Sequence, residues 1–548
     1  MVSVTTISEH LIGSLERSGL RHVFGIQGDY VLGFYHELWE SPLEVVNTCD
    51  EQSAGFAADA YARVSGFGAV CVTYGVGGLK LANTTAQAYA ESSPVLVISG
   101  APGISEREFD PLLHHKVRSF DTQLNVFREM TCAQAVLDDA ETAAGGIDGV
   151  IEAITETRRP GYIELPRDMI HVDVAPPGMR SLDERPDRSE TVHQSVTRAL
   201  EMLSSARRPV AIVGLEVHRF GLQPLILEFL ERSGMPFVTG VLGKSVISES
   251  HPQFLGVYAG ALSPDHVREA VEDSDCVIVI GPLTTDLATG IFTHNIDTSK
   301  GMVVFSGGVM FEDSAFEDVD MRKFLQALTA SIPPRRSRQS GLRSPRWHEL
   351  EPFAPESGRG VTVDRLFACL NDFLEEDTDV IAEAGDALFG ALSLVLRGKA
   401  QFISPAYYAS LGFGVPASIG VQLADPARRP LVLTGDGSFQ MTGMELSVSL
   451  KYGLNPIVVI LNNSGYGTFR PMADGPFNDI PPWRYAEIVR VIGGGKGYTV
   501  STEHELTGAL ADARRIAGSP AIIDVRLDKY DVSKPLRKLA EELKKRTG

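Results

Sequence analysis

One stretch constrains the fold of this 548-residue chain more than any other: two apolar runs that each end in small or polar residues. The first reads LVLTGDGS at positions 431–438, and the second reads PIVVILNN at positions 456–463. Apolar runs of this length are typical of buried parallel strands. Because the carboxyl ends of neighbouring parallel strands meet at one edge of a sheet, the pattern predicts that Asp436 and Asn463 lie side by side.

A helix is expected between the two strands. It is predicted to begin near Ser438 and to stop at Gly453, because glycine commonly ends helices. Its apolar positions are Met441, Met444, Leu446, Val448 and Leu450. The glycines on either side of Asp436 let the chain turn tightly between the first strand and this helix.

The polar side chains at this sheet edge have the chemistry of a cation site. A carboxylate and an amide oxygen form a partial oxygen shell, which suits Mg²⁺ because this ion keeps several waters and accepts phosphate oxygens. The N–H groups at the start of the helix would bind an anion. We therefore predict a diphosphate held through a divalent cation, and the alternative is a pair of turns without a ligand.

The order GDG, helix, strand and NN resembles the fingerprint of thiamine diphosphate enzymes. Nearly the whole chain is similar to the 2-oxo acid decarboxylases, particularly the phenylpyruvate and indolepyruvate decarboxylases. The resemblance implies thiamine diphosphate and Mg²⁺ as cofactors, and the release of an aldehyde and CO2 from a 2-oxo acid. It implies cofactor contacts at Gly385, Asp386, Ala409, Leu411, Gly435, Asp436, Gly437, Ser438, Asn463 and Gly465. The metal ligands among them would be Asp436, Asn463 and Gly465.

Composition disfavours several other classes of protein. Hydrophobic content of 43%, charged content of 22% and a mean hydropathy of +0.01 are typical of a globular protein without a membrane-spanning run. The first residues lack the features of a signal peptide, and five scattered cysteines without a CxxC pair indicate a reducing compartment and no zinc site. We expect a cytoplasmic protein with no membrane partner, and the net charge of −20 disfavours nucleic acid as a partner.

Strands and helices alternate along the chain, which predicts an α/β protein of three doubly wound domains with parallel sheets. Strands are expected at 22–26, 69–73 and 94–98, and then at 209–214 and 276–281. The last two end in glycine but do not complete GxGxxG, so the domain that contains them is predicted to be structural. The expected domains are pyrimidine-binding at 1–175, central at 191–332 and diphosphate-binding at 361–548, with connectors at 175–190 and 333–360.

Asp50 and Glu51 stand at the start of a helix of small residues, predicted for 51–64. By position, either carboxylate could cap this helix. The resemblance instead implies that Glu51 hydrogen-bonds N1′ of the cofactor's aminopyrimidine ring. A carboxyl group in an apolar pocket can share its proton with N1′, and this helps the 4′ nitrogen to take the proton from C2 of the thiazolium. We predict that Glu51 activates the cofactor.

His114 and His115 lie on a predicted loop, where tandem histidines are commonly plain surface residues. We expect their side chains to point in opposite directions, so that they cannot easily share a metal ion. The pair resembles the HH motif of the decarboxylases, and Asp29 in the sequence QGDY resembles the family's G-D motif, although it could be a simple turn aspartate. The resemblance implies that these three residues are acid–base groups that orient the substrate carboxylate and protonate the carbon that CO2 leaves.

The segment YASLGFG at 408–414 resembles the part of the family that bends the cofactor. The resemblance implies that the Leu411 side chain pushes the cofactor into its bent shape. The Ala409 carbonyl would accept a hydrogen bond from the 4′ amino group. An ordinary core leucine is the alternative for Leu411. The dipeptide Gly385-Asp386 resembles a further turn in contact with the cofactor.

One position departs from the pyruvate decarboxylase pattern. That pattern has a glutamate six residues beyond the second asparagine, whereas this chain has Phe469, next to Thr468. The difference removes a carboxylate from the proton-transfer groups and adds an apolar ring to the substrate pocket. Phenylpyruvate decarboxylases also carry an apolar residue there, and the segment 477–484 resembles theirs. We predict a pocket that includes Thr468 and Phe469 and prefers an aromatic or large aliphatic 2-oxo acid.

The resemblance implies that two chains build each active site. Glu51 of one chain would serve Asp436 of its partner, so a homodimer would be the least active unit and a homotetramer the common assembly. Two alternatives remain at this point: a carboligase of the acetolactate synthase type, and a cofactor-binding protein without turnover.

The C-terminal tail at 535–545 is predicted to dock on the protein through one helical face, formed by Leu536, Leu539, Ala540 and Leu543.

Overall fold

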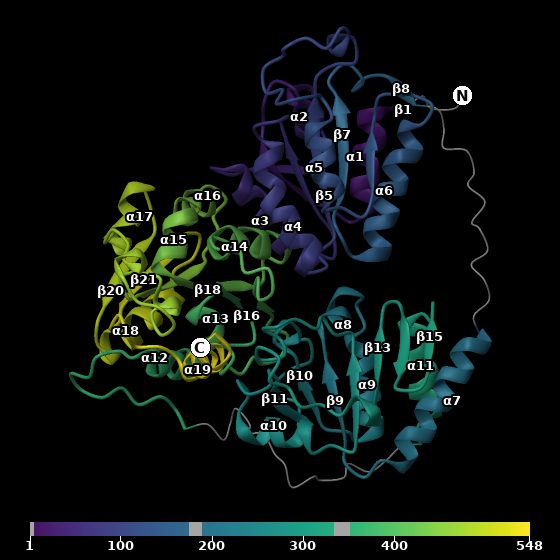
Figure 1. The fold of residues 1–548 in the computed structure, drawn as a ribbon. Coiled ribbons are helices and arrows are strands. Elements are labelled where there is room, and N and C mark those ends of the chain that lie inside the picture. Colours follow the sequence, from purple (N-terminus) through teal and green to yellow (C-terminus); the bar gives the residue numbers. More distant parts are fainter. Residues whose placement is uncertain (1–4, 175–188, 334–350, 548) are drawn as a thin grey trace.

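The computed structural model describes residues 5–174, 189–333 and 351–547. It arranges them around three sheets that follow one another along the chain, each with its own helices (Figure 1). The predicted α/β class is confirmed. The predicted connectors at 175–190 and 333–360 lie mostly outside the described residues. Within the described part, every helix is too short or too polar to span a bilayer.

The first sheet has six strands, all parallel, in the order β3-β2-β4-β5-β7-β6. Its central strands are buried on both faces, as expected where crossover helices cover a parallel sheet. The three strands predicted here are found as β2, β4 and β5. The strand bounds are His22–Ile26 for β2, Glu44–Asn47 for β3, Gly68–Val72 for β4, Val95–Ala101 for β5, Gln134–Val136 for β6 and Gly161–Pro166 for β7.

Helices connect these strands, and their bounds are Ile7–Arg17 for α1, Leu32–Glu40 for α2, Glu51–Ser65 for α3, Ala82–Ala90 for α4, Thr122–Arg128 for α5 and Ala143–Thr157 for α6. A short 3-10 helix, η1 (Gly78–Leu81), precedes α4. A small antiparallel ladder pairs β1 (Thr5–Thr6) with β8 (Asp173–Val174). This ladder joins the beginning of the first unit to its end.

The central sheet has seven strands in the order β11-β10-β9-β12-β13-β14-β15. This sheet is mostly parallel, as predicted, and β14 and β15 toward one edge run antiparallel to their neighbours. Only two residues separate β13 from β14, and so short a loop can join antiparallel strands but not parallel ones. The bounds are Pro209–Val213 for β9, Phe237–Thr239 for β10, Phe254–Val257 for β11, Cys276–Ile280 for β12, Gly301–Phe305 for β13, Gly308–Phe311 for β14 and Ala315–Glu317 for β15.

The helices of the central unit run at Ser189–Ser205 for α7, Leu215–Arg219 for α8, Gln223–Ser233 for α9, Asp265–Glu272 for α10 and Met321–Ser331 for α11. Most of the apolar core of this unit packs separately from the cores of the other two, as expected for a domain with its own interior.

The third sheet again has six parallel strands, in the order β17-β16-β18-β19-β21-β20. The two strands predicted from the apolar runs are β18 and β19, and they lie side by side at its centre. The strand bounds are Thr378–Ala382 for β16, Phe402–Ile403 for β17, Arg429–Gly435 for β18, Ile457–Asn462 for β19, Lys496–Val500 for β20 and Ala521–Arg526 for β21. The helix bounds are Val363–Phe373 for α12, Asp386–Ala391 for α13, Gly414–Ala424 for α14, Asp436–Thr442 for α15, Leu446–Lys451 for α16, Ile488–Val491 for α17, Glu503–Arg514 for α18 and Lys534–Thr547 for α19.

Helix α3 of the first unit packs against α14 of the third, and this contact joins the two units (Figure 1). The helices approach so closely that a Cβ on Gly420 would lie 2.0 Å from the carbonyl oxygen of Ala57. A glycine is therefore required at this point of the junction. The contact fixes the helix that begins with Glu51 relative to the sheet that carries Asp436.

The predicted docking of the C-terminal tail is confirmed. The side chains of Leu536, Leu539 and Ala540 are buried in α19. Leu536 and Leu539 belong to one apolar cluster with Leu388 and Phe389 of α13. The tail thus packs beside the turn at Gly385-Asp386 rather than extending into solvent.

Candidate active site

The predicted meeting of Asp436 with the turn after β19 is present in the structure. Gly435 at the end of β18 pairs with Leu461 of β19. The Asp436 carboxylate accepts hydrogen bonds from the backbone N–H of Gly437 at 2.8 Å and of Gly465 at 3.1 Å. These contacts join the two strand ends, as expected for neighbouring parallel strands.

The donor set at this edge fits a divalent cation. The Asp436 side chain is buried, and burial raises its pKa to about 6 despite the backbone hydrogen bonds that it accepts. The buried Oδ1 of Asn463 has no hydrogen-bond partner among the described residues. A buried carboxylate and a buried amide oxygen without a partner are costly alone and are ligands that Mg²⁺ accepts. Asp436, Asn463 and the turn at Gly465 could therefore hold the cation of a bound diphosphate.

The predicted bounds of the helix after this turn are wrong. Helix α15 begins at Asp436 itself, not near Ser438, and ends at Thr442. A 3-10 turn, η6 (Gly443–Glu445), then separates it from α16. Met441 and Met444, which were expected on a buried face, are 51% and 44% exposed in the single chain.

The turn at Gly385 lies beside the segment that follows Asn463. Gly385 has a φ of 101°, and a Cβ there would lie 2.8 Å from the Thr468 hydroxyl oxygen. Asp386 accepts a hydrogen bond from the backbone N–H of Ser533 at 2.9 Å, so its carboxylate anchors the start of the tail helix. Thr468 and Gly385, which the sequence placed in different parts of the site, are neighbours.

The segment with Ala409 and Leu411 is held by a residue that sequence reasoning missed. Glu383 accepts hydrogen bonds from the N–H groups of Phe413 at 3.2 Å and Gly414 at 2.7 Å. Gly412 N–H donates to the Ser438 hydroxyl at 2.9 Å. The rule that site residues follow strand ends could have indicated Glu383, because Glu383 directly follows β16, the neighbour of β18 in the sheet.

Ala409 has a positive φ of 59°, in the left-handed region that residues other than glycine seldom adopt. Leu411 is half-buried, so it is not an ordinary core leucine. Both residues lie on the segment that Glu383 and Ser438 fix at the edge of the third sheet. This segment is therefore rigidly attached to the turn that carries Asp436.

Glu383 should make the stability of the protein depend on pH. Burial raises its pKa from 4.5 to about 7, so the folded state binds this proton more tightly than the unfolded state does. Its contribution to the free energy of unfolding is complete below about pH 4.5 and is lost as the pH rises through 7. The destabilisation caused by Glu383→Gln should therefore be smaller at about pH 8 than at about pH 5, by up to about 3 kcal/mol.

Urea unfolding at the two pH values measures this difference. Glu503→Gln is the matched control, because the Arg365 guanidinium holds the pKa of Glu503 at about 2, and its effect should not change between these pH values. An equal loss of stability in Glu383→Gln at both pH values would contradict the role of burial.

The structure resolves which carboxylate caps α3. Asp50 is the N-cap residue, and its side chain accepts a hydrogen bond from Gln52 N–H at 2.8 Å. Glu51 is the first helical residue, and its carboxylate instead accepts a hydrogen bond from Lys80 Nζ at 2.8 Å. The cap is thus made by Asp50, and the Glu51 side chain is available for another function.

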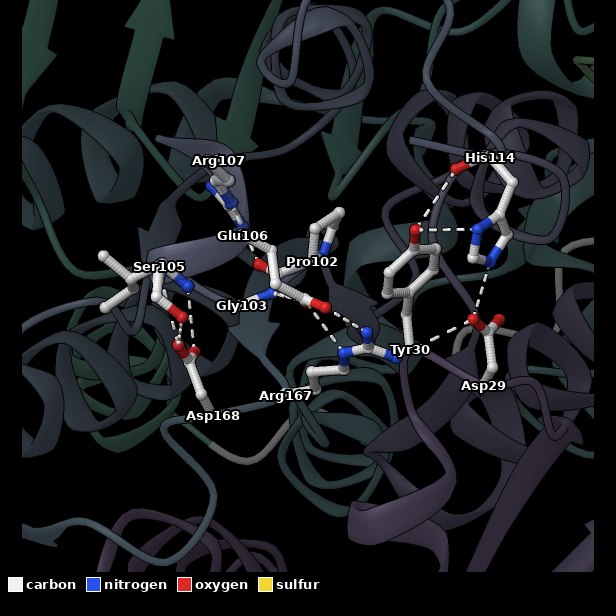
Figure 2. A network of polar contacts seen from close by, with 11 residues as sticks. Asp29, Tyr30, Pro102, Gly103, Ser105, Glu106, Arg107, His114, Arg167 and Asp168 are labelled. Atoms are coloured by element: carbon white, nitrogen blue, oxygen red, sulfur yellow. Dashed lines mark hydrogen bonds and ion pairs between the residues drawn. The ribbon is translucent and has the colours of Figure 1, made fainter. Parts of the chain in front are cut away.

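Asp29, His114 and His115 come together, as the resemblance implied. His114 Nε2 lies 2.6 Å from Asp29 Oδ2, and Tyr30 stacks on the His114 ring (Figure 2). The expectation that the two histidines point in opposite directions is wrong. His115 has a φ of 68°, which turns both rings to one side, with centroids 4.7 Å apart. One ligating atom from each of the three residues lies within 4.8 Å of the others.

Arg167 and Glu106 extend this cluster, and sequence reasoning missed both. Arg167 forms an ion pair with Glu106 and lies 3.9 Å from Asp29 Oδ2 (Figure 2). The Arg167 guanidinium lowers the pKa of Glu106. Because Arg167 directly follows β7, which pairs with β5, the strand-end rule could have indicated it. A cation thus stands beside the acid–base pair, where a substrate carboxylate could bind.

Phe469 closes the short 3-10 helix η7 (Gly467–Phe469). Its side chain is 52% exposed in the single chain, and Thr468 is half-buried beside it. A large ring that remains exposed one residue beyond Thr468 is available to contact a ligand.

Three family models match the chain. The N-terminal and C-terminal TPP binding domains of thiamine pyrophosphate enzymes match residues 5–125 and 383–525, and their central domain matches residues 196–304.

The chain is also similar to curated proteins over its full length. It is 34% identical to the indole-3-pyruvate decarboxylase of Azospirillum brasilense, with 98% of each chain covered. It is 32% identical to an alpha-keto-acid decarboxylase of Mycolicibacterium paratuberculosis, over 97% of this chain and 96% of that protein. It is 32% identical to pyruvate decarboxylase 1 of Pisum sativum, over 97% and 92%. Together with the strand-end turn at Asp436 and the three sheets, these matches show that the chain belongs to the thiamine diphosphate-dependent 2-oxo acid decarboxylases.

Proposed function

We propose that this decarboxylase acts on aromatic or large aliphatic 2-oxo acids, such as phenylpyruvate or indolepyruvate, and releases the corresponding aldehyde. The observation that carries the proposal is Phe469, an exposed ring where the pyruvate decarboxylase pattern has a glutamate. An apolar wall stabilises a bound phenyl or indolyl group by removing both surfaces from water. The similarity to an indole-3-pyruvate decarboxylase points in the same direction.

Mg²⁺ is the proposed partner of the cofactor's diphosphate. Asp436, Asn463 and the Gly465 backbone would hold the ion, and Gly435, Gly437 and Ser438 would line the diphosphate. The support is the buried carboxylate and the unpartnered Asn463 oxygen at one sheet edge. Because a carboxylate and an amide leave most of the octahedral positions free, phosphate oxygens and waters can complete the shell.

The proposed acid–base groups are residues of the first unit. Bound thiamine diphosphate supplies the electron sink for cleavage of the bond to CO2. Glu51 would hold a proton at N1′ of the bound cofactor. His114, which contacts Asp29 and Tyr30, would donate a proton to the substrate carbon that CO2 leaves, and the neighbouring His115 and Arg167 would orient the substrate carboxylate.

A kinetic comparison tests the substrate class. Because burying a phenyl group is worth about 1.5–3 kcal/mol, we expect kcat/KM for phenylpyruvate to exceed that for pyruvate by about 10- to 100-fold. Phe469→Ala should reduce this ratio, whereas Phe292→Ala, at an exposed ring of the central unit, is the control. A higher kcat/KM for pyruvate than for the aromatic and branched acids would refute the proposed preference.

The active unit is proposed to be a homodimer, within a homotetramer. Met441 and Met444 leave an apolar surface uncovered on the segment after Asp436. This surface flanks the loop before Glu51, because Cys49 N–H donates to Glu445 at 3.1 Å. A second copy of the chain would cover these methionines and bring its own cofactor-binding half to Glu51.

A further inference from the structure

Lys80 is placed directly against the carboxylate that should activate the cofactor. It lies in η1, and its Nζ donates to Glu51 Oε2 at 2.8 Å and also contacts the Asp50 carboxylate. The side chain of Lys80 is 50% exposed, whereas that of Glu51 is 13% exposed. Among the residues that the structure describes, no other side chain donates a hydrogen bond to Glu51.

Two contacts fix the backbone on both sides of this pair. Cys49 N–H donates to Glu445, which holds the loop before Glu51. Asn83, three residues after Lys80, donates to the Ser410 hydroxyl at 2.6 Å. The helix that starts at Glu51 is further fixed by its packing on α14. The Lys80 side chain, in contrast, is half exposed and reaches two carboxylates.

Lys80 and N1′ of the bound cofactor would compete for the Glu51 carboxylate. The two acidic neighbours raise the pKa of Lys80, so the ammonium is charged at neutral pH. The charge-assisted hydrogen bond from the ammonium group takes up one acceptor position of Glu51 Oε2. A ring nitrogen that approaches this oxygen from the same direction would displace the ammonium group.

We propose that Lys80 is an exchangeable partner of Glu51, which occupies its carboxylate in the empty site and moves to Asp50 alone when N1′ of the cofactor binds. This inference rests on the proposed role of Glu51. Asp50 lowers the free-energy cost of the exchange. One of its carboxylate oxygens stays in contact with the ammonium group while the other caps α3. Lys80 is thus a positioning residue that orients the Glu51 carboxylate before binding and lowers the affinity for the cofactor.

Calorimetric titration of the cofactor-free enzyme with thiamine diphosphate and excess Mg²⁺ tests this exchange. Since a partly exposed ion pair is lost on binding, Lys80→Met should bind the cofactor about two- to fivefold more tightly than the wild type. Lys80→Arg keeps the pair and should restore the wild-type affinity. Lys300→Met, which removes an exposed lysine paired with Asp297 in the central unit, should have no effect.

The same titration in a Glu51→Gln background isolates the pair. There Lys80→Met should cause no further gain in affinity, because the partner that it competes for is gone. Unchanged or weaker binding by Lys80→Met in the wild-type background would overturn the exchange. If the wild-type protein bound no thiamine diphosphate, the proposed cofactor site itself would fail, which is a different result.

Discussion

Glu51→Gln is expected to lower kcat by about 10²- to 10⁴-fold, the usual contribution of a positioned general acid–base group. Its affinity for Mg²⁺ and the diphosphate should change little, because Asp436 and Asn463 lie on another sheet. Glutamine can still donate or accept a hydrogen bond, but it cannot exchange a proton with N1′. Steady-state kinetics and cofactor titration on the same preparation separate the two effects.

Glu44→Gln is the control for this substitution. It removes an exposed carboxylate from β3 of the same sheet, so it should leave both kcat and cofactor affinity near their wild-type values. A fully active Glu51→Gln enzyme would show that another group activates the cofactor. A loss of cofactor binding equal to the loss of turnover would place Glu51 in binding rather than in proton transfer.

A mixture of two inactive variants is expected to regain activity. If Glu51 of one chain serves Asp436 of its partner, a dimer of one Glu51→Gln chain and one Asp436→Ala chain contains one intact site. When the chains of an equimolar mixture assort at random, half of the dimers contain one chain of each variant. Each mixed dimer has one intact site out of two, so the refolded mixture should recover about a quarter of the wild-type activity. Each variant refolded alone should remain inactive, and the activity is measured as aldehyde release per chain.

The control mixture combines Asp436→Ala with Asn463→Ala. Both changes lie in the cofactor-binding half of the third unit, so every site in every dimer keeps one defect and no activity should return. An inactive mixture of Glu51→Gln and Asp436→Ala, despite demonstrated exchange of chains, would place Glu51 and Asp436 of each site in the same chain.

The central edge of the third sheet could be predicted from sequence because it depends on local pattern and on one topological rule. Two apolar runs define β18 and β19, and parallel pairing then brings the residues after them together. The same reasoning located β2, α3 and the docked tail. At these places the helix or strand propensity, the burial pattern and the turn residues all predict the same local structure. A short segment of sequence is therefore enough to predict it.

Features set by distant contacts could not be predicted in this way. The helix after Asp436 breaks at Gly443, where a Cβ would lie 2.4 Å from the Phe439 ring, and Glu445 turns toward Cys49 of the first unit. The positive φ of His115, which brings the two histidine rings together, is a backbone conformation that sequence periodicity does not report. The contact of Lys80 with Glu51 likewise joins two segments that no short-range pattern relates.

Metal-dependent binding of thiamine diphosphate tests the account most directly. Titration calorimetry on the metal-free protein should detect tight binding when Mg²⁺ is present and little binding when a chelator replaces it. Asp436→Ala and Asn463→Ala should abolish the metal-dependent part, while Phe469→Ala keeps it. Binding that is equally strong with and without Mg²⁺, and unchanged in Asp436→Ala, would contradict the claim that the two strand ends hold the cofactor through a cation.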